Sequence, residues 1–181
     1  GLTLKDWDDS RVKDNTLASN ARGLLLDGSS VNLFSDNAFR ANDTAVTLFS
    51  SAERNAFGGN QFVDNWSDLV LSGRDSGTRW SVGGRGNYWS DNPAFDLNGD
   101  GIADTAYRPN DIIDQVVWRA PAAKLLLNSP AVQVIRWAQA RFPAIHPGGV
   151  LDSAPLMRPV RPPALALLDP AECWLPHPGR R

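Results

Sequence analysis

NTLASN at residues 15–20, NAFRAN at 37–42 and NQFVDN at 60–65 are three copies of one pattern, N-x-[LF]-x-x-N. The second copy starts 22 residues after the first, and the third starts 23 residues after the second. Self-similarity at a fixed period of this length indicates a solenoid, in which each repeat is one coil stacked on the next. Four residues after each copy comes an apolar-x-apolar pair: Leu24 and Leu26, Val46 and Leu48, Leu69 and Leu71.

The spacing of apolar residues inside each repeat identifies the kind of solenoid. Apolar residues alternate at i and i+2 over short segments, which is typical of strands rather than helices. Leucine-rich repeats have a similar length, but they need more leucines at fixed places and a helical arm. The sequence therefore predicts an all-β fold, a right-handed parallel β-helix with about 22 to 23 residues per coil.

Asparagine recurs at equivalent places because it tolerates left-handed backbone at corners and its amide can bond to its copies in neighbouring coils. We expect Leu17, Phe39 and Phe62 to stack in the core in the same way. A second series steps 23 residues from Asn32 to Asn55. A step of 22 residues from Asn65 to Asn87 is expected to continue the stacking.

A carboxylate-rich loop follows the repeats, within GNYWSDNPAFDLNGDGIADTAYRP at 86–109. Residues 96–104 follow the pattern D-x-N-x-D-G-x-x-D, whose alternate side chains can point at one centre while the glycine permits a sharp turn. Oxygen ligands of this kind select Ca²⁺. The predicted calcium ligands are Asp96, Asn98, Asp100, the carbonyl of Ile102, and Asp104.

Two interpretations of this loop remain open. Tyr107 stands where an EF-hand has its bidentate glutamate, so the set is incomplete, and Asp111 and Asp114 are candidates for the last ligand. Asp, Asn and Gly also favour turns that hold no ion. We favour a structural calcium ion, because three carboxylates within nine residues would otherwise repel one another.

Composition limits the possible partners and the location. The chain has 181 residues with 18 basic and 20 acidic side chains, which gives no electrostatic case for binding nucleic acid. Cys173 is the single cysteine, so no internal disulfide can form. No segment is apolar enough to span a bilayer. The chain begins at Gly1 inside a repeat, and we interpret it as the C-terminal part of a longer protein.

Beyond residue 110 the repeat ends. Ser129 and Pro130 predict the start of an amphipathic helix over about 130–142, and Pro143 predicts its end. This helix either covers the end of the solenoid or contacts a partner or a membrane surface. The expected domains are β-helix coils at 1–92, a calcium-type loop at 93–115, a cap with the helix at 116–159, and a proline-rich tail at 160–181.

The chain resembles the NosD family of periplasmic β-helix proteins. The resemblance rests on the coil repeat, on Asn87-Tyr-Trp-Ser-Asp91, on the loop at 96–104, and on Asp152-Ser-x-Pro-Leu-Met-x-Pro159. It runs from about Asn15 to Pro159 and is strongest after Gly86. β-Helix proteins of archaeal surface layers share only the first half of this signature.

The resemblance implies a non-enzymatic, periplasmic role in maturing the copper centres of nitrous oxide reductase. NosD-like proteins act beside an ABC transporter, made of the ATPase NosF and the permease NosY, in delivering copper or sulfur. Periplasmic copper is held by Met and His. The chain has one Met and two His residues, of which His146 and Met157 are the candidate copper ligands.

A competing hypothesis is a carbohydrate-active β-helix enzyme, a lyase or a glycosidase. Asp14 and Asp36 are 22 residues apart and therefore occupy equivalent places on adjacent coils. A retaining glycosidase needs such a carboxylate pair about 5 Å apart. Both residues precede a corner asparagine, however, and turn chemistry also accounts for them. A cell-surface adhesive β-helix is a third possibility.

Overall fold

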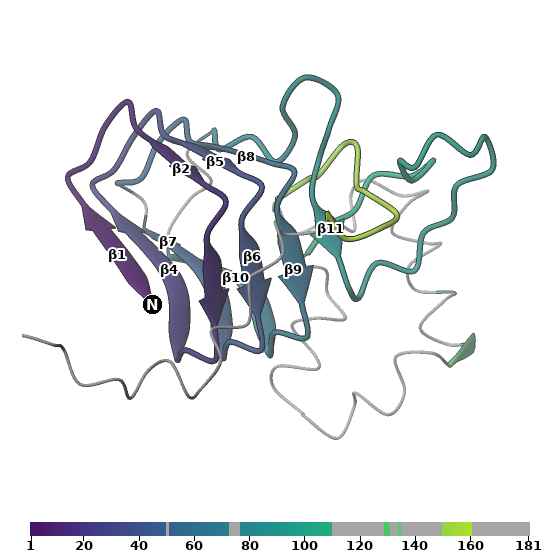
Figure 1. Ribbon diagram of the computed structural model, residues 1–181, viewed down its shortest axis with the longest axis horizontal. Helices are drawn as coiled ribbons and strands as arrows, with labels where there is room; N and C mark the ends of the chain where they lie inside the picture. Colours follow the sequence, from purple (N-terminus) through teal and green to yellow (C-terminus); the bar gives the residue numbers. More distant parts are fainter. Residues whose placement is uncertain (50, 73–76, 110–128, 131–133, 135–149, 161–181) are drawn as a thin grey trace, which may run out of the picture.

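The computed structural model describes residues 1–49, 51–72, 77–109, 129–130, 134 and 150–160. In these ranges the fold is built from short strands, and the β-helix that the repeat predicts is confirmed (Figure 1). The strands are β1 (Leu2–Lys5), β2 (Arg11–Lys13), β3 (Thr16–Ala18), β4 (Arg22–Asp27), β5 (Leu33–Ser35), β6 (Ala38–Arg40), β7 (Thr44–Phe49), β8 (Ala56–Gly58), β9 (Gln61–Val63), β10 (Ser67–Ser72) and β11 (Tyr88–Trp89).

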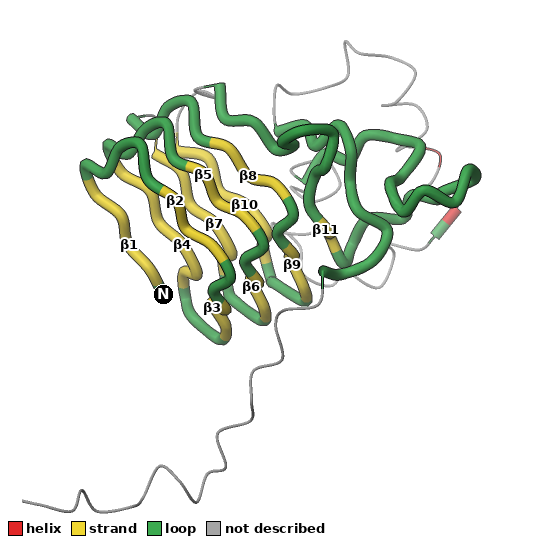
Figure 2. Tube along the Cα trace, turned by 45° about the horizontal axis from the view of Figure 1, so that its top comes forward, coloured by secondary structure: helices red, strands yellow, loops and turns green. Residues whose placement is uncertain are grey.

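Successive coils contribute one strand each to three parallel sheets. The sheets have the orders β1-β4-β7-β10, β2-β5-β8 and β3-β6-β9-β11. The predicted offsets set the register, because Leu24 pairs with Val46, and Leu69 pairs with Val46 from the other side. Figure 2 shows the strands of adjacent coils lying side by side, with the loops of the C-terminal end beyond β9.

Each coil turns at three corners that have the same local structure. At each corner a residue with positive φ precedes an asparagine, as Asp36 (φ 55°) precedes Asn37 and Ala41 (φ 49°) precedes Asn42. The next coil repeats this with Gly59 (φ 72°) before Asn60. Left-handed backbone bends the chain sharply within one residue, and the asparagine that follows places its side chain in the interior.

The interior asparagines form hydrogen-bonded ladders along the solenoid. The backbone N–H and the side-chain amide of Asn37 both donate to Oδ1 of Asn60, each at 3.0 Å. Asn60 donates in the same way to Oδ1 of Asn87, at 3.1 and 2.9 Å. The Asn60 amide also donates to the Phe34 carbonyl at 3.0 Å. Each rung therefore satisfies the buried polar groups of its own corner and of the coil before it.

The expected step from Asn65 to Asn87 is wrong. Asn87 stacks on Asn60, 27 residues earlier, rather than on Asn65. The shift arises because residues 82–85 form a small turn in which Val82 and Arg85 pair in antiparallel fashion. This insertion passes close to Gly58 and Gly59 of the preceding coil, where the absence of side chains leaves room for it.

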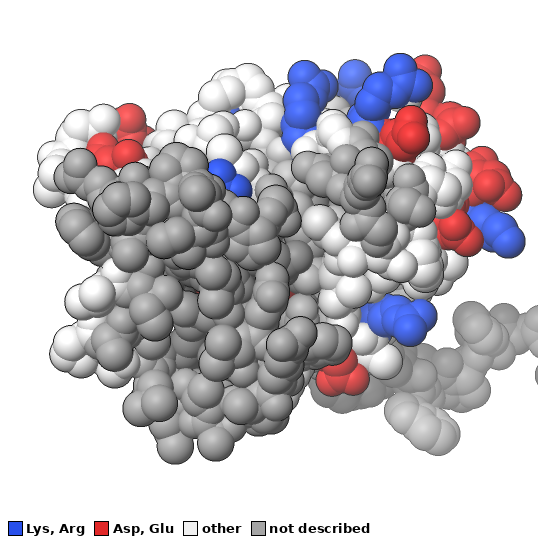
Figure 3. Space-filling view, turned by 180° about the vertical axis from the view of Figure 1, so that it is seen from behind, with Lys and Arg blue, Asp and Glu red and all other residues white. Residues whose placement is uncertain are grey.

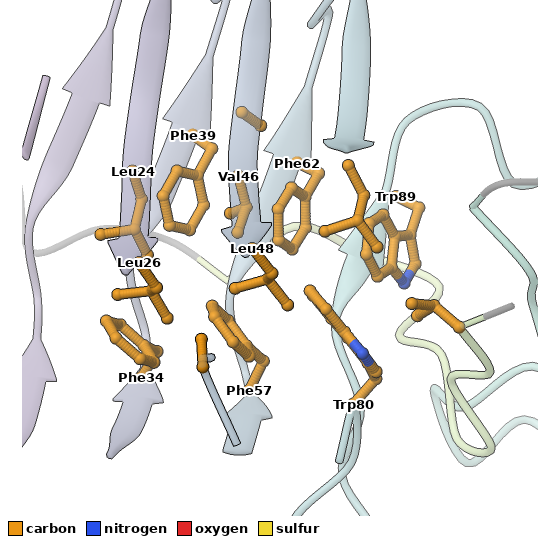
Figure 4. Close-up of a cluster of buried hydrophobic side chains, with 14 of the residues drawn as sticks. Leu24, Leu26, Phe34, Phe39, Val46, Leu48, Phe57, Phe62, Trp80 and Trp89 are labelled. Carbon is orange, nitrogen blue, oxygen red and sulfur yellow. The ribbon is translucent and has the colours of Figure 1, made fainter. Parts of the chain in front are cut away.

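Two columns of stacked aromatic rings run through the core beside Leu24, Leu26, Val46 and Leu48 (Figure 4). One column runs through Phe34, Phe57 and Trp80, with ring centroids 4.5 and 4.4 Å apart. The other is the predicted Phe39 and Phe62 stack, 4.9 Å apart, which continues to Trp89 at 4.1 Å. Leu17 pairs with Phe39 at the start of this second column, as expected. Each fully buried ring stabilises the fold by about 1.5 to 3 kcal/mol relative to an exposed one.

The helix expected over about 130–142 lies outside the described residues apart from Pro130 and Val134, so it stays a prediction. The expected tail at 160–181 lies outside them apart from Val160. The domain boundaries that depend on these segments also stay predictions.

The central rung of the longest ladder predicts a position-dependent loss of stability. We expect Asn60→Ala to lower the free energy of unfolding by about 3 kcal/mol, because buried donors and acceptors of two neighbouring coils lose their partner. Asn92→Ala, at a half-buried asparagine outside the ladders, is the control and should lower it by less than about 1 kcal/mol. Denaturant titration measures both, and equal losses would contradict the ladder as a source of stability.

A strained corner predicts a stabilising substitution. Val31 has φ 60° and is 45% exposed, so its branched side chain occupies left-handed backbone without being buried. Val31→Gly should raise the free energy of unfolding by about 0.5 to 1 kcal/mol, because glycine adopts this backbone freely. The control, Val63→Gly in strand β9, should lower it by a similar amount. Destabilisation by both substitutions in thermal unfolding would rule out strain at Val31.

Candidate functional site

The loop at 96–104 is organised by its own side chains. Asp96 accepts hydrogen bonds from the backbone N–H groups of Gly99 (2.6 Å) and Gly101 (2.8 Å). Asp104 accepts one from Leu97 (2.8 Å), which joins the two ends of the loop. Gly99 and Gly101 have φ values of 76° and 85°, a backbone conformation that glycine adopts without strain.

The central residues of the loop also bond to each other. Asp100 donates its N–H to Oδ1 of Asn98 at 3.0 Å, and Oδ2 of Asp100 accepts from the Asn98 amide at 3.0 Å. The N–H of Ile102 donates to the other Asp100 oxygen at 2.8 Å. All four predicted side-chain ligands therefore belong to one exposed or half-buried loop whose donor atoms are oxygens.

The loop has oxygen ligands of the kind that calcium prefers, but its carboxylates are not grouped around one centre in this structure. Across the described ranges, no three His, Cys, Asp or Glu side chains are grouped so that they could hold a metal ion. Asp96, Asp100 and Asp104 each have a carboxylate oxygen bonded to backbone N–H. To bind Ca²⁺, these carboxylates would turn toward a common centre while the glycine turns stay in place.

The loop rests on a segment from far along the chain, residues 150–157, which we call the clasp. The N–H of Ala103 donates to the Pro155 carbonyl at 2.8 Å, and the N–H of Met157 donates to the Gly101 carbonyl at 3.0 Å. Ile102 and Leu156 form an antiparallel bridge between them. On its other side the clasp pairs in parallel with β11, through Leu156 and Tyr88. The clasp thus lies between the last coil and the candidate calcium loop.

Asp152 fixes the clasp to the end of the asparagine ladder. Its Oδ2 accepts hydrogen bonds from the backbone N–H (2.7 Å) and the amide (3.2 Å) of Asn87, and from the indole N–H of Trp89 (2.9 Å). Its Oδ1 accepts from the N–H of Ala154 at 3.1 Å. The carboxylate takes the place of the next asparagine, and because it has no donor, the ladder ends there.

Close approach of the clasp requires a glycine. A Cβ atom at position 86 would overlap the Asp152 carboxylate and lie 2.5 Å from the Ala154 carbonyl. Gly86 donates its own N–H to that carbonyl at 2.8 Å. The glycine before Asn87 is therefore part of the junction between the coil and the clasp.

Burial raises the pKa of Asp152 above its ordinary value, because the ionised carboxylate has lost contact with water. The hydrogen bonds from Trp89, Asn87 and Ala154 act against this rise in the pKa by stabilising the charged form. The residue is fully buried, and desolvation outweighs the hydrogen bonds.

Sequence reasoning identified the motif that begins at Asp152 but assigned no role to the carboxylate. Its partners lie 65 and 63 residues earlier in the chain, and no repeat connects them. The available signal was Asp152, which lies four residues before the apolar Leu156 and three residues before Pro155, a residue that stops regular structure. That signal does not indicate which strand the segment joins.

Of the two candidate copper ligands, the structure describes only Met157. Met157 is half-buried and is held through its backbone to Gly101. His146 lies outside the described residues, so this pair stays a prediction.

The carboxylates considered for a glycosidase are engaged in corner structure and ion pairs. Asp14 and Asp36 both have positive φ, 58° and 55°, as their turn positions predict. Asp36 pairs with Arg85 at 3.0 Å and with Lys13 at 3.9 Å, while Asp14 pairs with Lys13 at 3.5 Å. These contacts account for both side chains without a catalytic role.

The surface carries charges of both signs. Seen from behind, Lys and Arg side chains lie beside Asp and Glu side chains rather than forming one continuous basic area on the described residues (Figure 3). No helix in the described part of the chain is long and apolar enough to cross a membrane.

Comparison with known proteins identifies relatives of this chain. Residues 1–94 match the family described as "Periplasmic copper-binding protein (NosD)". A protein named "Probable ABC transporter binding protein NosD" from Stutzerimonas stutzeri is 41% identical over 138 residues, which are 76% of this chain and 31% of that protein. A protein of the same name from Pseudomonas aeruginosa is 39% identical over 147 residues, 80% of this chain and 34% of that protein.

The chain spans about a third of the length of these two relatives. The match to the family covers residues 1–94 of 181, the part of the chain that forms the asparagine ladders and the aromatic columns. The chain therefore belongs to the NosD family.

Proposed function

We propose that the protein is a periplasmic accessory factor that helps to mature the copper centres of nitrous oxide reductase, working with an ABC transporter that delivers copper or sulfur. The family is described as periplasmic and copper-binding, and two relatives are named as ABC transporter binding proteins. These descriptions concern the family and the relatives, and they support this assignment for the present chain. The family match over residues 1–94 is the observation that carries the proposal.

The architecture suits a binding role. Ladders of hydrogen bonds and stacked rings hold the coils rigidly, so the outward side chains form a fixed surface on which a transporter or an acceptor protein can dock. The ATPase NosF and the permease NosY are the proposed transporter partners. No observation on the described residues favours the carbohydrate-active alternative, because Asp14 and Asp36 are accounted for by corner structure.

Copper would be cargo in this role, and it would be held by soft or borderline ligands. Met157 is the candidate ligand on the clasp, and His146 is the other candidate. The matched residues make up only 31% and 34% of the two relatives, so further ligands in the longer protein are part of the proposal.

We also propose that the loop at 96–104 binds calcium and that the ion is structural. Gly101 and Ala103, which lie between the ligands Asp100 and Asp104, are hydrogen-bonded to the clasp. An ion that drew the loop carboxylates together would stabilise these backbone contacts and with them the whole C-terminal end.

The maturation role predicts a loss of copper from the reductase. In a strain that lacks the full-length protein, we expect purified nitrous oxide reductase to contain little copper, and expression of the parent protein should restore it. The measurement is copper per reductase by elemental analysis, with the periplasmic copper concentration held constant. A fully metallated reductase in the deletion strain would refute the proposal.

The partnership is tested separately by co-purification. The tagged full-length protein should recover an ABC ATPase and its permease from detergent-solubilised membranes, identified by mass spectrometry. Recovery of neither, together with binding to a polysaccharide, would move the assignment to the carbohydrate or cell-surface class.

Calcium binding predicts an ion-dependent melting temperature. We expect Ca²⁺ to raise the midpoint of thermal unfolding of the parent protein and EDTA to reverse the increase, because the ion binds only the folded loop. Asp100→Ala should abolish the increase and should change copper affinity much less. The control is Asp91→Ala, an exposed carboxylate outside the loop, which should keep the full response. Identical melting of the parent protein in Ca²⁺ and in EDTA would show that the loop is an ion-free turn.

A further inference from the structure

The clasp continues the asparagine ladder, but its ladder contact with the last coil joins residues much farther apart in sequence than the contacts between successive coils do. The ladder partners elsewhere are 22 to 27 residues apart, whereas Asn87 and Asp152 are 65 residues apart. The clasp contributes no ring to the two aromatic columns, which reach the last coil where Trp80 stacks on Phe57 and Trp89 stacks on Phe62. Its apolar contribution to the buried core is Val150.

The clasp and the candidate calcium loop are joined to each other as one unit. Tyr107 and Asp152 exchange two backbone hydrogen bonds, both 2.9 Å. With the contacts of Gly101 and Ala103 described above, these pair the clasp with the loop over most of its length. Two backbone bonds join the clasp to the coil, from Gly86 N–H to the Ala154 carbonyl and from Leu156 N–H to the Asn87 carbonyl, at 2.8 and 2.9 Å.

The side chain that secures this junction is a carboxylate whose hydrogen-bond partners among the described residues are all neutral. It faces the N–H and amide of Asn87 and the indole of Trp89 on the coil, and the N–H of Ala154 on the clasp. The titratable neighbour on the loop is Tyr107, which pairs with Asp152 through its backbone. In the part of the chain that the structure describes, no charged side chain forms an ion pair with Asp152. A buried charge without a counter-ion weakens a junction, whereas the asparagine rungs carry no charge.

We propose that residues 150–157 are a detachable clasp, closed by Asp152, that opens and closes on the end of the β-helix while the coils stay folded. Elements of low local stability open before the rest of a protein, in contiguous units. Opening breaks the contacts to Gly86, Asn87 and Trp89 and exposes the strand edge beside β11. Such an edge can pair with an extended segment of another chain.

The buried carboxylate makes the clasp sensitive to protons. Because burial raises the pKa of Asp152 in the closed state, the closed state binds a proton more readily than the open state does. The stabilising effect of that proton is fully present below the open-state pKa, near 3.8, and is lost as the pH rises through the higher closed-state pKa. The clasp should therefore hold most firmly in acid and open more often as the pH approaches neutrality.

Hydrogen exchange of the full-length protein, followed by mass spectrometry, tests this proposal. Protection factors are compared between peptides covering 150–157 and peptides covering 56–65, which correct for the pH dependence of intrinsic exchange. We expect protection of the clasp to fall as the pH rises from 4 to 7, by about tenfold for each unit by which the Asp152 pKa is raised. Protection of the coil peptides should stay constant.

Asp152→Asn is the first variant, because it removes the charge and keeps the size of the side chain. Its clasp should show no pH dependence over this range. The proposal is overturned if Asp152→Asn follows the same pH profile as the parent protein. It is also overturned if the coil peptides lose protection in parallel with the clasp, because that would be global unfolding.

Trp89→Phe is a second, independent test of whether the Asp152 carboxylate controls opening of the clasp. It can be used even if Asp152→Asn does not fold. Phenylalanine can keep the stacking on Phe62 but removes one donor to the carboxylate. We expect a larger loss of clasp protection at neutral pH, with the coil unchanged. The matched control is Ser153→Ala, which removes the 2.8 Å contact with Ser81 and should leave the pH profile unaltered. An unchanged clasp in Trp89→Phe would also overturn the proposal.

Discussion

The asparagine ladder is the interaction on which this structure depends. Each corner buries a backbone N–H and a side-chain amide, and one oxygen of the next asparagine accepts both. Without that oxygen, left-handed corners would leave unpaired polar groups inside the protein, at a cost of about 1 to 3 kcal/mol each. The backbone pairing of the parallel strands sets the spacing of the coils, and that spacing allows the rings of Phe34, Phe57 and Trp80 to stack.

A ladder of this kind has a direction and must end. In the ladder from Asn15 to Asn87, each asparagine donates to the next coil, so Asn87 needs an acceptor from beyond the last coil. Asp152 supplies it from the clasp, and the candidate calcium loop covers the other edge of the clasp. The C-terminal end is thereby closed by two segments that are separated in sequence. In a NosD-family protein, this closure also places Met157, a candidate copper ligand, against the loop at Gly101.

The end of the β-helix and its coils differ in the kind of energy that holds them. Buried aromatic rings and neutral amides hold the coils, and neither changes with pH or with metal ions. A buried carboxylate and a carboxylate-rich loop hold the end, and we propose that the first responds to pH and the second to calcium. A rigid body with a responsive end is suited to a protein that must bind one partner and release another.

The sequence by itself determined the β-helix, the inward stacking of Phe39 and Phe62, and the registers of β4, β7 and β10, because these follow from contacts between residues one period apart. It also placed Asp96, Asn98, Asp100 and Asp104 in one loop, since their spacing is local. Only the tertiary structure decided that Asn87 stacks on Asn60 and that Asp152 ends the ladder. An insertion and a return of the chain from 65 residues away break the period, and a pattern that depends on the period contains no information about either.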